Sequence, residues 1–189
     1  MLLEIKWIGR GGQGVVLANQ VFATAAIREG KYSQAFPEFG PERSGAPVKG
    51  YTRIADSPIE DHSIIYEPDI IVVIDPRLSL EAESYSGVKE EGIAVVNVTE
   101  KRVNDIKKID ALRGRKVFYV DAWKISNEVF KSTKPIFNTP MIGALAKALG
   151  EPKRTTLEEV IKDRFKGSVA EQNLTAIKLG FEEVKKLEF

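Results

Sequence analysis

The sequence predicts an α/β fold: a single domain spanning residues 1–189, with a mostly parallel β-sheet, helices on both faces and a helical C-terminal part. Short β-rich runs alternate with helical patterns as far as residue 120. The run 70–74 is unbroken apolar sequence, as expected of a central strand that is buried on both faces. A chain of 189 residues is long enough for one such core and too short for two ordinary domains with a linker.

The first strand is expected at residues 2–8, and a glycine-rich turn leads from it into a helix over residues 15–29. The run 32–36 is a further strand candidate, which stops at Pro37 because proline lacks the N–H of a sheet ladder. Four later apolar runs complete the predicted sheet: residues 48–54, 70–74, 93–98 and 117–120.

Polar residues at the ends of these runs are expected to start helices. Asp75 is expected to cap a helical turn that begins near Arg77, with Pro76 in the first position, although this edge of an open sheet also binds ligands. Asn138 or Thr139 is expected to cap a helix over residues 141–149, or to face a ligand. The last helices are expected at residues 157–165, capped by Thr155 or Thr156, and at residues 169–187, capped by Ser168.

Charge and cysteine content exclude several kinds of function. The 28 basic and 27 acidic residues are dispersed, which argues against nucleic acid as the main ligand. The chain has no apolar run long enough for a membrane span and no signal peptide, so we expect a soluble, cytoplasmic protein. It has no cysteine and one histidine, His62, which excludes a thiolate nucleophile, cysteine-ligated zinc and an ordinary iron–sulfur cluster within this chain. Any redox centre must belong to a partner.

A glycine-rich run after the first strand is the strongest local motif. It consists of Gly9, Arg10, Gly11, Gly12, Gln13 and Gly14, and it matches G-x-G-x-x-G. In a three-layer, Rossmann-like fold, such a turn presents backbone N–H groups and a helix N-terminus to a phosphate. A nicotinamide dinucleotide also needs an acid at the end of the next strand, and only Glu38, in a turn after Pro37, is available. Two interpretations stay open: a phosphate site with Arg10 as a fixed charge, and a tight turn that packs against another subunit.

Residues 36–47 contain three prolines, two glycines, two phenylalanines and three charged residues, a composition that fits neither a helix nor a central strand. A surface loop is one interpretation, but exposed aromatic residues favour an ordered loop that packs against a partner. Arg43 is expected to pair with a ligand or with a carboxylate of another subunit, or internally with Glu38 or Glu42. The candidate interface or ligand residues are Glu38, Phe39, Glu42 and Arg43.

Four other side chains have a less specific expectation. Arg53, in the strand at residues 48–54, is expected to be an exposed cross-strand charge rather than a second anion contact. Trp7 and Trp123 are expected in the core or in an interface, and His62 at the surface.

Several motifs together resemble a known family. The glycine-rich run is followed by PEFGPERSGAPV at residues 37–48, YTRI at 51–54, PDI at 68–70 and NTPM at 138–141. This combination resembles the gamma subunit of the 2-oxoacid:ferredoxin oxidoreductases, and the pyruvate enzyme (pyruvate synthase) most closely. Ser44 departs from the larger, basic or glycine residue that relatives often carry, which affects only the details of that loop.

The resemblance implies a subunit of a heteromeric oxidoreductase. Such a complex oxidatively decarboxylates pyruvate to acetyl-CoA and CO₂ with thiamine diphosphate, Mg²⁺ and 4Fe-4S clusters, and it passes electrons to ferredoxin. The partners would be alpha-, beta- and delta-type subunits, and an isolated chain could pair with itself. This chain would hold no catalytic residue and no cofactor alone, and its glycine-rich run would bind a phosphate of coenzyme A or only pack against a partner. A stand-alone nucleotide or coenzyme A binding module and a purely scaffolding subunit are the alternatives.

Overall fold

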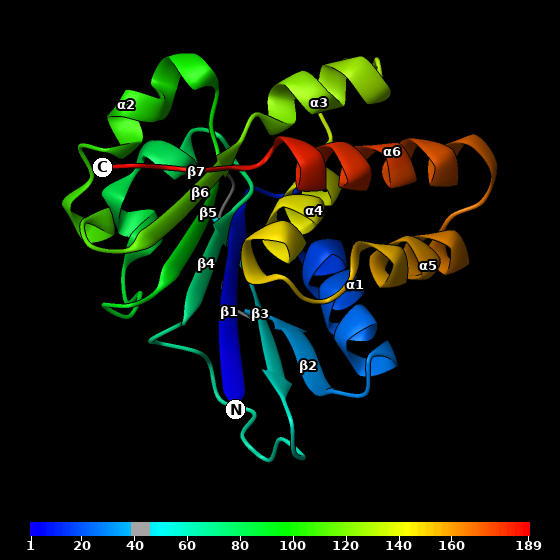
Figure 1. Cartoon of the computed structure of the whole chain (residues 1–189), viewed down its shortest axis with the longest axis horizontal. Helices are drawn as coiled ribbons and strands as arrows, with labels where there is room; N and C mark the ends of the chain where they lie inside the picture. The colour runs from blue at the N-terminus through cyan, green and yellow to red at the C-terminus, as the bar shows by residue number, and fades with distance from the viewer. Residues whose placement is uncertain (39–45) are drawn as a thin grey trace.

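The computed structural model describes residues 1–38 and 46–189, and in this part of the chain a seven-stranded sheet has the order β2-β3-β1-β4-β5-β6-β7 (Figure 1). The strands are β1 (Leu2–Gly9), β2 (Tyr32–Pro37), β3 (Val48–Ala55), β4 (Ile70–Val73), β5 (Ile93–Asn97), β6 (Lys116–Val120) and β7 (Lys185–Lys186). Strands β1, β4, β5 and β6 are parallel neighbours. The predicted α/β class with a mostly parallel sheet is confirmed.

The antiparallel position of β3 is a feature that the sequence did not predict. Strand β3 lies between β1 and β2 and pairs antiparallel with both. Its register with β1 extends from Leu2 opposite Ala55 to Gly9 opposite Val48, so the two strands pair over their whole lengths. An apolar run shows that a strand forms, but it does not show the direction of its partner. The sheet is therefore mixed at this side.

The long helices pack on one face of the sheet. They are α1 (Val15–Arg28), α3 (Ala122–Val129), α4 (Asn138–Leu149), α5 (Arg154–Arg164) and α6 (Gly167–Glu183). The other face is covered by short 3-10 helices and the one-turn α2 (Val103–Ile106), and Figure 1 shows α2 and α1 on opposite sides of the sheet. Helices on both faces are confirmed, although one layer consists of long helices and the other of short helical turns.

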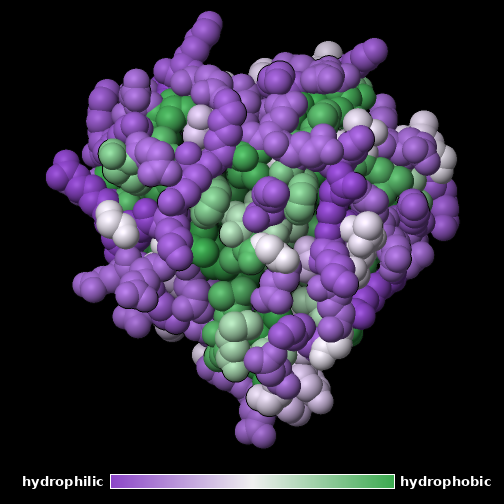
Figure 2. All heavy atoms as spheres, viewed as in Figure 1, coloured by the Kyte–Doolittle hydropathy of each residue, from purple (hydrophilic) through white to green (hydrophobic). Residues whose placement is uncertain are grey.

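Successive side chains of the central strands point to opposite faces of the sheet, so each helical layer has its own hydrophobic core. Val72 and Val95 join the cluster beneath the long helices, whereas Val73 and Val96 join the cluster beneath the short ones. Figure 2 shows hydrophilic residues over most of one view of the molecule and hydrophobic residues in a central band over β1 and β4. Burial on both sides explains why these strands are apolar at consecutive positions.

Several predicted helix boundaries in the C-terminal part are wrong. Helix α5 starts at Arg154, before both predicted caps, and the Thr156 hydroxyl donates to Glu29 Oε1 at 2.6 Å instead of capping the helix. Helix α6 starts at Gly167 rather than after Ser168, and it ends at Glu183. The following residues form β7, which pairs antiparallel with β6.

Helices α4 and α6 cross at two glycines. A Cβ atom at Gly180 would lie 2.0 Å from the carbonyl oxygen of Pro140, and one at Gly143 would lie 2.1 Å from that of Ile177. The two backbones approach each other so closely that any side chain at these positions would have to displace a helix. This contact fixes α4, whose first residues reach the glycine-rich run.

Neither a membrane span nor a metal site is found in the part of the chain that the structure describes. Its helices lack the length and apolar character required to cross a bilayer. Likewise, no three histidine, aspartate or glutamate side chains among the described residues gather as a metal site would require.

Candidate functional site

The glycine-rich run lies where the chain connections change face. Strand β1 continues into α1 on one face, and the neighbouring parallel strand β4 continues into the short 3-10 helices on the other. In open α/β sheets this divergence creates a crevice at the carboxyl ends of the strands, where ligands bind. Gly9 ends β1, and Asp75 follows β4 by two residues, so the two border this switch point.

Two glycines of the run are required by contacts within the chain. A Cβ at Gly9 would lie 2.7 Å from Cγ2 of Val15. Gly14 has φ 74° and precedes α1, and a Cβ there would lie 2.3 Å from Nδ2 of Asn138. Both glycines therefore allow the close packing of the turn.

The other two glycines are exposed. Gly12 has φ 82°, a left-handed conformation that favours glycine. Gly11 is different, because a Cβ there would meet no described atom within 4 Å and its φ is not positive. Among the described residues, neither packing nor backbone strain explains why position 11 is glycine.

The amides at the start of α1 face this exposed turn. The first helical hydrogen bond runs from Ala18 N–H to the carbonyl of Gly14. Within the described ranges, no side chain caps the helix, and its first turn contains no acidic residue. The N–H groups of the first turn and the positive end of the helix dipole are therefore suited to an anion.

Helix α4 begins at the same place. Asn138 Nδ2 lies 3.5 Å from the carbonyl oxygen of Gly14, while its Oδ1 accepts from Thr139 N–H at 3.0 Å. Asn138 is thus the first residue of α4 rather than its cap, and it joins α4 to the glycine-rich run. The Thr139 hydroxyl is fully buried and has no hydrogen-bond partner in residues 1–38 and 46–189.

Asp75 connects the glycine-rich run to the helical turn that follows β4. Its Oδ1 accepts from the N–H groups of Arg77 and Leu78, each at 2.9 Å, which confirms the predicted capping role. Its Oδ2 accepts from Gln13 Nε2 at 2.7 Å and lies 3.6 Å from Arg10 Nε. These donors counter the charge of the carboxylate next to the proposed anion site.

Gln13 and Asn97 are polar residues that hold this edge together. Gln13 Oε1 accepts from Arg10 N–H at 2.7 Å, so the Gln13 side chain spans the turn. Asn97, the last residue of β5, donates to the Ile74 carbonyl at 2.9 Å and accepts from Ala122 N–H at 3.1 Å. The sequence analysis missed Asn97, although a buried polar residue at the end of an apolar strand is a detectable signal.

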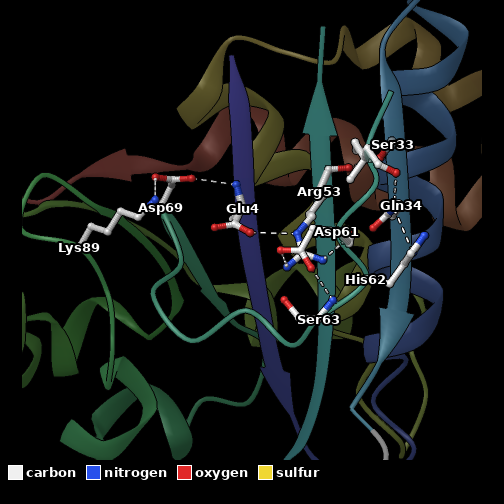
Figure 3. A network of polar contacts seen from close by, with 10 residues as sticks. Glu4, Ser33, Gln34, Arg53, Asp61, His62, Ser63, Asp69 and Lys89 are labelled. Atoms are coloured by element: carbon white, nitrogen blue, oxygen red, sulfur yellow. Dashed lines mark hydrogen bonds and ion pairs between the residues drawn. The ribbon is translucent and has the colours of Figure 1, made fainter. Parts of the chain in front are cut away.

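The expectation that Arg53 is exposed is wrong. Its side chain is 1% exposed, and its Nε pairs with Glu4 Oε1 at 2.9 Å across the β1–β3 ladder. Its guanidinium also donates to the Asp61 carbonyl at 3.1 Å, and Figure 3 shows these three residues joined on one side of the strands. The charge does pair across strands, but it is buried because the segment that follows β3 covers it.

The segment after β2 is only partly described. Glu38 accepts a hydrogen bond from the Tyr51 hydroxyl and lies 3.6 Å from Lys49 Nζ. Burial, followed by the Glu38 contact, raises the pKa of Tyr51 well above its usual value. Phe39, Glu42 and Arg43 lie outside the described residues.

The ends of this segment lie near the glycine-rich run. Glu38 N–H donates to the Lys49 carbonyl at 3.0 Å, and Val48 pairs with Gly9. A separate groove of about 530 Å³ lies beside β2, on the far side of β3 from β1, and it is lined by Gln34, Ala35, Phe36, Pro37, His62 and Ile64. His62 is exposed, as predicted, and its Nδ1 lies 3.2 Å from Gln34 Nε2. This groove does not include the glycine-rich run.

Comparisons with known proteins agree with this architecture. The family model "Pyruvate ferredoxin/flavodoxin oxidoreductase" matches residues 4–183. The common gamma subunit of the pyruvate and ketoisovalerate oxidoreductases of Pyrococcus furiosus is 44% identical over 187 residues, which cover 99% of this chain and 100% of that protein. The pyruvate synthase subunit PorC of Methanothermobacter thermautotrophicus is 41% identical, with 98% of each chain covered.

Solved structures show the same likeness. The crystal structure of the pyruvate oxidoreductase subunit PorC of Thermotoga maritima matches with a TM-score of 0.84 and 39% identity over 99% of each chain. The 2-oxoglutarate:ferredoxin oxidoreductase of Magnetococcus marinus shares the fold, with a TM-score of 0.72 and 19% identity over 95% of this chain and 30% of that one. The chain therefore belongs to the pyruvate ferredoxin/flavodoxin oxidoreductase family, as a gamma-type subunit of a 2-oxoacid:ferredoxin oxidoreductase.

Proposed function

We propose that this subunit holds a phosphate of coenzyme A at its glycine-rich run, in a complex that converts pyruvate to acetyl-CoA and CO₂ and reduces ferredoxin. The observation that carries the proposal is Gly11, an exposed glycine without a steric role among the described residues. It lies in the turn before the N-terminus of α1, which no described side chain caps, at the switch point of the sheet. A glycine there leaves room for a phosphate to reach the backbone N–H groups.

The residues of this chain suit coenzyme A better than the other groups of the reaction. The chain has no cysteine for an iron–sulfur cluster, and its described residues offer no carboxylate and histidine cluster for a metal. Thiamine diphosphate, Mg²⁺ and the 4Fe-4S clusters are therefore assigned to the alpha-, beta- and delta-type partners. The Pyrococcus furiosus relative is named as a subunit common to pyruvate and ketoisovalerate oxidoreductases, which supports placing the choice of 2-oxoacid on a partner.

The segment Glu38, Phe39, Glu42 and Arg43 is proposed to contact the catalytic partner beside this site. Support comes from the register of β3, because Val48 lies opposite Gly9 and the Glu38 amide bonds to Lys49. A partner that covers this edge would also cover the bound coenzyme A.

Gly11→Val tests the coenzyme A site. In the assembled complex, we expect the KM for coenzyme A to rise roughly 10- to 100-fold, because a side chain would block charge-assisted hydrogen bonds to the turn. Pyruvate-dependent reduction of an artificial acceptor without coenzyme A should survive. Thermal unfolding of the isolated variant should stay near wild type, since a Cβ at this position meets no described atom within 4 Å.

Gly12→Ala provides a comparison of stability with Gly11→Val and not a binding control, because Gly12 belongs to the same proposed site. Its φ of 82° strains any L-residue, so this variant should lose about 1 kcal/mol of stability. An unchanged KM for coenzyme A in a fully assembled Gly11→Val complex would refute the site and leave a scaffolding role for the turn.

The isolated chain is expected to show no oxidation of pyruvate. It lacks the means to bind thiamine diphosphate or to carry electrons, so activity should appear only when the other subunits are added. The measurement is pyruvate-dependent reduction of an artificial acceptor by the pure chain, before and after reconstitution. Turnover by the pure chain would contradict the assignment of the redox chemistry to partners.

A further inference from the structure

Trp123 is a large aromatic side chain that remains accessible at the sheet edge that carries the glycine-rich run. The chain has two tryptophans, and they differ sharply: Trp7 is fully buried, whereas Trp123 is 46% exposed. Trp7 Nε1 donates to the Thr52 hydroxyl at 3.0 Å within the core. A half-exposed indole offers a large, flat, amphipathic face of the kind that is enriched at binding interfaces.

The indole is supported from one side. Its ring centroid lies 5.7 Å from that of Phe137, with an interplanar angle of 38°. Phe137 is buried and immediately precedes Asn138, whose Nδ2 lies 3.5 Å from the Gly14 carbonyl. A short series of contacts therefore links Trp123 to the glycine-rich run.

The backbone around Trp123 is also fixed. Trp123 is the second residue of α3, and Asp121 caps this helix by accepting from Lys124 N–H at 2.9 Å. The preceding amide, of Ala122, donates to Asn97, which also bonds to the Ile74 carbonyl after β4. The indole is consequently held at the carboxyl edge of the sheet, which is the edge that the glycine-rich run occupies.

We propose that Trp123 stacks on the adenine ring of coenzyme A, a role that rests on the proposed phosphate site at the glycine-rich run. Coenzyme A carries adenine a few bonds from its pyrophosphate and its 3′-phosphate. A rigid indole with one face against Phe137 gives a purine a flat, sequence-independent platform. Trp123 is then a binding residue for the adenosine end of the cofactor.

The kinetic test compares Trp123→Ala with Trp123→Phe in the assembled complex. We expect Trp123→Ala to raise the KM for coenzyme A about tenfold, in the range found when an aromatic platform for a base is removed. Trp123→Phe should stay within about threefold of wild type because it retains an aromatic face. Inhibition by 3′,5′-ADP should weaken with Trp123→Ala, whereas inhibition by 4′-phosphopantetheine, which lacks adenine, should not change.

A binding readout independent of turnover uses the intrinsic fluorescence of the isolated full chain. Titration with 3′,5′-ADP should quench the emission of the wild-type chain but not that of Trp123→Phe, in which only the buried Trp7 remains. Titration with 4′-phosphopantetheine should leave both unchanged. Equal quenching of wild type and Trp123→Phe would overturn the proposal.

The outcomes separate this proposal from the one on which it rests. If Gly11→Val raises the KM for coenzyme A and Trp123→Ala does not, the phosphate site stands and the adenine platform is refuted. If Trp123→Ala reduces subunit assembly while the KM for coenzyme A in the assembled fraction is normal, Trp123 belongs to a subunit interface and the platform is refuted. If neither variant changes this KM, both proposals are refuted.

Discussion

Gly180→Ala is expected to lower the free energy of unfolding by about 3 kcal/mol. The added Cβ would lie 2.0 Å from the Pro140 carbonyl oxygen, and the obstacle is backbone rather than a flexible side chain. Helices α4 and α6 must therefore move apart. The usual sign is opposite, because glycine to alanine at an open position in a helix stabilises it by roughly 1 kcal/mol.

Urea unfolding of the isolated chain measures this effect. Lys178→Ala is a suitable control, since Lys178 is exposed on the same helix and its replacement should change stability by less than about 0.5 kcal/mol. An alanine variant at 180 that is as stable as wild type, or more stable, would show that the two helices do not meet at this glycine.

Arg53→Met is expected to have a comparable effect, a loss of about 3 kcal/mol. The arginine is 1% exposed and the paired Glu4 side chain is 20% exposed, so the substitution leaves a largely buried carboxylate without its ion-pair partner. It also removes the hydrogen bond to the Asp61 carbonyl and the contact with the Phe36 ring, whose centroid lies 5.6 Å from the guanidinium carbon.

The exposed pair Arg113 and Asp110 provides the matched control. Their charged atoms lie 3.0 Å apart, but the side chains are 71% and 84% exposed. Arg113→Met should therefore cost well under 1 kcal/mol. Equal losses for the two methionine variants in urea unfolding would contradict the burial of the Arg53 pair. Combining Arg53→Met with Glu4→Gln should recover part of the loss, because the carboxylate that was left unpaired is removed as well.

The sequence predicted correctly those elements whose residues carry a strong local pattern. The apolar run at 70–74 and the glycine-rich run are short, strongly patterned segments, and the structure places a buried strand and a strand-to-helix turn there. Strand β7 is different, because Lys185 and Lys186 carry no strand pattern and form a strand only by pairing with β6.

Such local patterns could not predict contacts between residues that are far apart in the sequence. A charged residue in a strand normally indicates a solvated face, but Arg53 pairs with Glu4, 49 residues away in sequence, and the segment that follows β3 covers it. Similarly, Asp75 was identified as a cap from Pro76 and its neighbours, whereas its bond to Gln13 depends on the adjacency of β1 and β4.

The antiparallel insertion of β3 has a consequence for cooperativity. Because β3 is antiparallel, its first residue, Val48, lies opposite Gly9. The segment proposed to bind a partner therefore leaves and rejoins the sheet at the edge where coenzyme A is proposed to bind. If both proposals hold, we expect occupancy of one surface to alter the free energy of occupying the other, and such coupling is reciprocal. If assembly tightens coenzyme A binding by a given factor, coenzyme A must tighten assembly by that same factor, and the cofactor acts as a ligand that holds the complex together.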